Sequence, residues 1–132
     1  MLFRSRRTRL IIFLVVAAAF YVLGLSNEVY DVASPPALSF HTALRKVESI
    51  VAFAAVAAAM AWWLGPTRRL PLYLVAGMAC YSGLIELGQR LEASHEWIVE
   101  SLFDVFCGAA GGYIVAAAML FWGRRSNVDR KR

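Results

Sequence analysis

The sequence predicts an all-α, polytopic membrane protein whose four transmembrane helices form one antiparallel bundle, with both termini in the cytoplasm. Apolar side chains make up 60% of the 132 residues, whereas an ordinary soluble domain has about 45–50%. These residues gather in four continuous runs, and a run of about 20 residues crosses a bilayer as a helix. The four predicted spans, within a single membrane domain of residues 1–132, are Leu10–Leu25, Val47–Leu64, Leu70–Gln89 and Leu102–Trp122.

The first span has a second interpretation. Four arginines precede an apolar run of 16 residues that contains Ala17-Ala18-Ala19, a pattern that also resembles a cleavable signal peptide. Cleavage would leave three spans and an outer N-terminus. The sequence leaves this alternative open.

The second and third spans are predicted to form a tight hairpin. Gly65 suits the end of a helix, and Pro71 suits the first turn of the next one. The fourth span follows a polar segment that begins after Arg90, so it returns the chain across the membrane.

Charge predicts the orientation. Eleven of the fourteen basic residues lie in the two tails and in the turn between the second and third spans, and eight of the nine acidic residues lie toward the other side. The positive-inside rule places the basic segments in the cytoplasm. The net charge of +5 therefore indicates membrane orientation and contact with anionic lipid, and it predicts no nucleic-acid partner.

Five polar residues border or interrupt the apolar runs near the predicted outer boundary. Glu86, Gln89 and Arg90 stand at i, i+3 and i+4, so they share one helix face. Glu86 lies about 24 Å from the start of its span and Asp104 about 27 Å from the end of its own, and Lys46 begins the second span at the same boundary.

A charge at the centre of a membrane helix costs about 2.5–3.5 kcal/mol, and less near the edge. The common depth of these residues therefore predicts an outer polar pocket that binds a ligand. In a second interpretation, Glu86 pairs with Lys46 or Arg90 only to fix the packing, and Asp104 only complements the helix dipole.

The fourth span carries small residues on one face. Gly108 and Gly112 are four residues apart, with Gly111 beside them, and such a pattern permits close helix approach. Asp104 lies one turn before Gly108, which favours packing within the bundle over homodimerisation.

Few residues suggest chemistry other than binding. His41 and His95 fall in predicted outer loops, and Cys80 and Cys107 fall within spans. No catalytic or metal-ligand spacing links them, so we predict no metal and no cofactor. Paired carboxyl groups can perform acid–base catalysis, so an enzyme acting on lipid-linked envelope precursors stays open as the less favoured alternative.

Residues of about 45–115 resemble the VanZ-like family of small integral membrane proteins. Ile85-Glu86 with Gln89 matches the family's Ile-Glu-x-x-Gln run, and Asp104 and Gly111 match a pattern that opens the next helix. Lys46 and Phe53 match parts of an earlier pattern. The chain departs from the family at three of its positions, which here hold Arg45, Ser49 and Cys107.

The resemblance implies a bacterial cytoplasmic membrane protein with a role in the cell envelope, of the glycopeptide-resistance or envelope-polysaccharide type. We expect the outer pocket to bind or shield an envelope lipid or glycan head group. The alternative is a small accessory subunit of a larger membrane complex.

Overall fold

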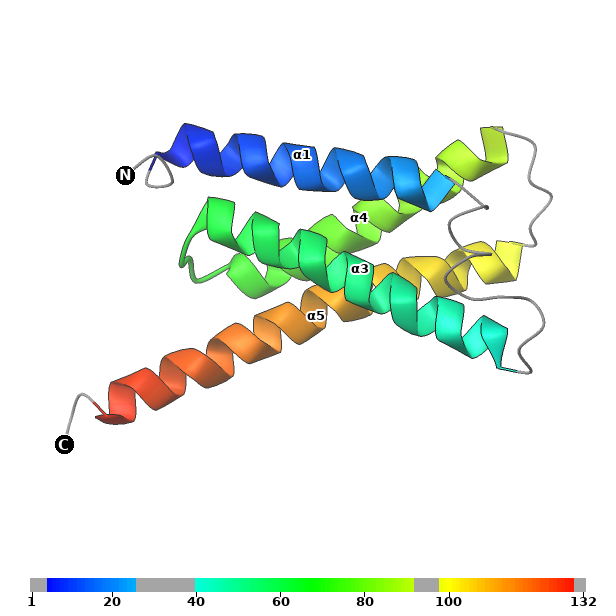
Figure 1. Cartoon of the computed structure of the whole chain (residues 1–132). Helices are drawn as coiled ribbons and strands as arrows, with labels where there is room; N and C mark the ends of the chain where they lie inside the picture. Colours follow the sequence, from blue (N-terminus) through cyan, green and yellow to red (C-terminus); the bar gives the residue numbers. More distant parts are fainter. Residues whose placement is uncertain (1–4, 26–39, 92–97, 130–132) are drawn as a thin grey trace.

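A computed structural model of the chain describes residues 5–25, 40–91 and 98–129. These residues form four α-helices and no strand: α1 (Arg6–Leu25), α3 (His41–Leu64), α4 (Leu70–Leu91) and α5 (Ile98–Asp129) (Figure 1). Each helix is long and apolar enough to cross a membrane. The predicted all-helical class and the four candidate spans are therefore confirmed.

The helices are longer than the predicted spans. α3 begins at His41 rather than at Val47, and α5 continues to Asp129. An apolar run marks the thickness of the hydrocarbon layer, whereas the helix itself continues through polar residues such as arginine, which have good helix propensity.

A short turn joins α3 to α4. Gly65 adopts a positive φ of 72°, and its N–H donates to the carbonyl of Ala61 at 2.9 Å. A residue with a side chain would be strained in this conformation. Pro71 lies in the first turn of α4, where its missing N–H leaves no helical hydrogen bond unmade.

In Figure 1, α3 and α4 lie between α1 and α5. The most extensive helix contact joins α4 to α5, followed by α3 to α5, and α1 packs mainly on α3. Leu74 of α4 lies beside Gly112 of α5, and Met78, further along α4, lies beside Gly108, which comes earlier on α5. These two helices therefore run in opposite directions.

The buried apolar residues form two clusters along the helices. The larger cluster fills the half of the molecule nearer the α3–α4 turn and contains Val56, Ala57, Ala61, Leu70, Leu74, Met78 and Ala116. The smaller cluster contains Phe53, Ile85 and Cys107 and lies toward the start of α3. The candidate site is built around this second cluster.

Candidate functional site

An ion pair joins the beginnings of α3 and α5. Lys46 Nζ contacts Asp104 Oδ1, and the two side chains are 29% and 21% exposed. The ammonium group also lies 5.7 Å from the centroid of the Phe103 ring, within the range of a cation–π contact. The pair is thus partly desolvated yet still reachable from outside.

A second contact connects the same end of α5 to α4. Ser82 Oγ donates a hydrogen bond of 2.8 Å to the backbone carbonyl of Asp104. Ser82 is 1% exposed, and Glu86, one turn further along α4, is 8% exposed. Residues four apart share a helix face, so α4 carries its buried carboxyl group beside the α4–α5 interface.

The other two predicted residues take different positions. Gln89 Nε2 donates to the carbonyl of Gly24 at 2.7 Å, which ties the end of α4 to the end of α1. Arg90 is exposed. We call Lys46, Glu86, Gln89, Arg90 and Asp104 together the polar layer. Within it, the Lys46–Asp104 pair is a direct contact, whereas Gln89 bonds to α1.

Three glycines set the distance of α5 from its neighbours. A Cβ atom added to Gly108 would lie 2.7 Å from the carbonyl oxygen of Met78 on α4, and one added to Gly111 would lie 2.7 Å from Cβ of Phe53 on α3. At Gly112 the corresponding approach is 2.4 Å, to the carbonyl oxygen of Leu74. Only hydrogen fits at such contacts. The glycines pack one face of α5 closely against α3 and α4 and hold the nearby carboxyl group of the ion pair against α3.

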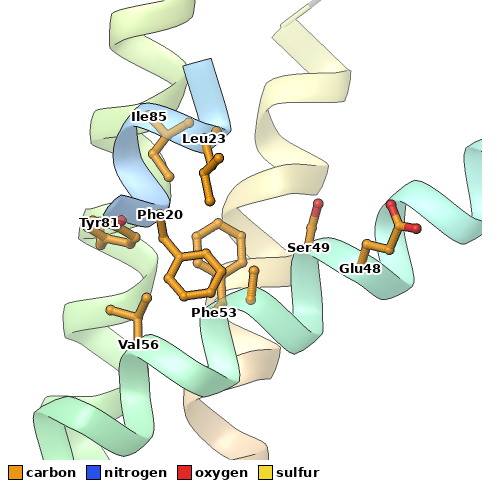
Figure 2. Close-up of a pocket in the computed structure, with 10 residues that line it drawn as sticks. Phe20, Leu23, Glu48, Ser49, Phe53, Val56, Tyr81 and Ile85 are labelled. Carbon is orange, nitrogen blue, oxygen red and sulfur yellow. The ribbon is translucent and has the colours of Figure 1, made fainter. Parts of the chain in front are cut away.

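Beside the polar layer lies a partly open cavity of about 290 Å³ between α1, α3 and α4 (Figure 2). We call it the lateral cavity. Its walls are almost wholly apolar. The lining residues are Phe20, Leu23, Gly24, Glu48, Ser49, Ala52, Phe53, Val56, Tyr81 and Ile85.

The rings that line the lateral cavity are held in place. Tyr81 donates its hydroxyl to the carbonyl of Ala17 on α1 at 2.5 Å, and its ring meets that of Phe53 edge-on, with centroids 6.1 Å apart. In Figure 2, Ser49 and Glu48 lie to one side of these rings. The cavity thus has an apolar floor and a polar side that is supplied by α3.

None of the five residues of the polar layer lines the lateral cavity. The sequence did not point to Glu48 or to a cavity at Ser49, which stood out only as a departure from the VanZ-like pattern. The signal that could have found them is local: a carboxyl and a hydroxyl group lie beside the small residue Ala52 within an apolar run.

The part of the chain that the structure describes contains no group of three or more metal-ligating side chains. Cys80 is exposed and Cys107 is buried, and neither is in a disulfide. His95 lies outside the described residues. The contacts that the structure shows at the site are hydrogen bonds, an ion pair and apolar packing.

Comparison with protein-family models, with curated proteins and with solved structures finds no match to this chain. The fold nevertheless defines a class, since four helices that can each span a bilayer are those of a multi-pass membrane protein.

Proposed function

We propose that this chain is a VanZ-like protein of the bacterial cytoplasmic membrane whose polar layer binds or shields a polar group of a cell-envelope component. The observation that carries the proposal is the Lys46–Asp104 pair. It joins two helices at one end of the molecule and keeps about a quarter of each side chain accessible. At this exposure the ammonium and carboxylate groups can contact a ligand as well as each other.

The orientation is part of the proposal. The start of α1, the end of α5 and the α3–α4 turn lie toward one end of the molecule (Figure 1). Together with the sequence tails that adjoin α1 and α5, these segments hold eleven of the fourteen basic residues. The positive-inside rule favours an antiparallel bundle with this end in the cytoplasm. The polar layer then faces the outer side of the membrane.

The proposal is tested in a bacterial host that lacks the protein, with susceptibility to teicoplanin as the readout. Expression of the wild-type chain is expected to raise the inhibitory concentration. Glu86→Gln and Asp104→Asn should each abolish this effect while the amount of protein in the membrane stays unchanged. Asp129→Asn makes the same chemical change at the far end of α5 and should keep the effect. Full protection by both polar-layer variants would refute the proposed role.

A second candidate function is that of an accessory subunit in a larger membrane complex. From Ala117 to Gly123 every residue of α5 is exposed, and this part of the helix leads away from the others (Figure 1). Lipid or another protein can cover that surface. Gentle detergent purification distinguishes the two, because a subunit would bring larger proteins with it in fixed stoichiometry.

A further inference from the structure

We infer that the lateral cavity holds one hydrocarbon chain of a membrane lipid, and that Glu48 and Ser49 accept hydrogen bonds from the head-group region of that lipid. The inference goes beyond the proposed function and needs only that the helices span a membrane. It names a ligand class, a lipid with hydrogen-bond donors near its head, and a binding site outside the polar layer.

The apolar walls of the cavity determine what can fill it. Phe20, Phe53, Val56 and Ile85 supply carbon surface, and a cavity of this kind does not retain water. The cavity lies between helices that can span a membrane, so the surrounding medium is hydrocarbon. If the cavity were empty, the side chains that line it would lose dispersion contacts. In a membrane, the acyl chain of a neighbouring lipid is available to fill it.

The size of the cavity fits part of one chain. A water molecule takes about 30 Å³ of liquid, and a methylene group is of similar size. The volume of about 290 Å³ therefore corresponds to roughly ten methylene groups. Two chains would not fit within it.

The polar side of the cavity determines which hydrogen-bonding groups the lipid head group must carry. Ser49 already donates its hydroxyl hydrogen to the carbonyl of Arg45 at 2.9 Å, so toward a ligand its oxygen can act only as an acceptor. The carboxyl group of Glu48 has lone pairs for several hydrogen bonds, so it can accept from a ligand in addition to contacts within the protein. Both groups call for a donor, which in lipids is an ammonium or a hydroxyl group.

Depth makes this contact possible. Glu48 lies five residues inside the candidate span that begins at Ala43, which is roughly 7 Å along the helix axis. The head-group boundary is therefore within reach of its side chain. The chain of the same lipid would continue past Ala52 toward Val56, which lies deeper on the same helix.

The experiment uses the purified full chain in nanodiscs with photoreactive lipids that carry a diazirine in the acyl chain. Three probes share the same chains and differ in the head group, which is ethanolamine, glycerol or choline. Mass spectrometry locates the labelled residues. We expect labelling at cavity residues of α1, α3 and α4, with the choline probe, which has no donor, at least about fivefold weaker, a ratio equivalent to about 1 kcal/mol.

Comparison of the two favoured probes identifies the donor. Stronger labelling by the ethanolamine probe assigns an ammonium donor, and stronger labelling by the glycerol probe assigns hydroxyl donors. Equal labelling by these two probes shows that the site accepts either kind of donor. In Glu48→Gln the preference over the choline probe should fall. Equal labelling of the wild type by all three probes would overturn the head-group assignment.

Two variants fill the cavity from different helices. Ala52→Phe places a ring into it from α3, and Leu23→Trp does so from α1. Both should lose most of the label at cavity residues. Ala55→Phe adds the same ring on the exposed side of α3 and should keep it. Size-exclusion profiles identify any variant that fails to fold. If one filling variant fails to fold, the other one tests whether the cavity holds the lipid chain.

Undiminished cavity labelling in a folded, filled variant would overturn the chain site. The labelling needs no resistance phenotype. A failure of the lipid site and a failure of the polar-layer function are therefore seen in different measurements.

Discussion

Replacement of Gly112 by alanine tests the packing that positions the candidate site. The added Cβ atom would lie 2.4 Å from the carbonyl oxygen of Leu74 and 3.0 Å from Cα of Val75. Both are backbone atoms, so no side-chain rotation relieves the contact. Ordinary van der Waals contact begins at 3.4 Å, so α4 and α5 must separate by about 1 Å at this point.

The expected cost follows from two opposing terms. Overpacking of a well-packed interface costs about 1–3 kcal/mol. Alanine in a helix interior gains about 0.5–1 kcal/mol over glycine. Because the added atom meets backbone that cannot rotate away, the overpacking cost lies in the upper half of its range. The net loss in the free energy of unfolding should therefore be about 1–2 kcal/mol, which raises the unfolded fraction by about 5–30-fold.

The buried thiol of Cys107, which is 4% exposed, supplies the assay. In a Cys80→Ser background, a thiol-reactive dye labels the protein only when the helices open, and the rate follows the open population when opening and closing are fast. Gly112→Ala should label about 5–30-fold faster than the parent. Gly83→Ala is the matched control, because nothing lies within 4 Å of its added Cβ atom, and it should label no faster. If Gly112→Ala labels at the parent rate, the close α4–α5 contact does not stabilise the fold.

Four further substitutions and one double variant probe the contacts around the site with the thiol assay and with hydrogen exchange. Lys46→Met and Asp104→Asn each leave one partner of the partly buried pair without its opposite charge and should cost about 1–2 kcal/mol. The exchanged double variant should recover most of this loss, and no recovery would count against the pair. Gln89→Leu removes the hydrogen bond to the Gly24 carbonyl, costs about 1 kcal/mol and should speed hydrogen exchange in the last turn of α1. Tyr81→Phe keeps the ring but loses the hydroxyl's bond to α1, so it should cost a similar amount, and an unchanged exchange rate in α1 would show that this bond is dispensable.

The spans are predictable from the sequence because the bilayer imposes its own length scale. An apolar run of the right length is selected by the hydrocarbon thickness, independently of which helix packs on which. For the same reason, counting residues along each helix axis is enough to place Lys46 and Asp104 at one depth. The direct contact between the two side chains agrees with that count.

Axial counting does not give the direction in which each side chain points. Glu86 and Gln89 share a broad face of α4, yet Gln89 turns to the carbonyl of Gly24 on α1. That partner is a backbone atom, which no residue pattern marks. The lateral cavity was missed for a related reason. It arises where three helices meet and where the small residues Gly24 and Ala52 leave space, so it depends on the placement of α1 relative to α3.

The packing of the molecule indicates which wall of the lateral cavity yields most easily. The buried residues of both clusters, and the glycine contacts that involve backbone atoms, lie on α3, α4 and α5, whereas α1 adds partly buried side chains and glycine contacts to side-chain atoms only. α1 has Gly24 as its one buried residue among those described. Its polar contacts include hydrogen bonds from Arg9 to α3 and from Tyr81 and Gln89 on α4. Each such bond contributes only about 1 kcal/mol, whereas separating α5 would break close-packed contacts along both of its neighbours. Any widening of the lateral cavity for a longer or bulkier lipid chain therefore moves α1, the helix whose displacement costs least.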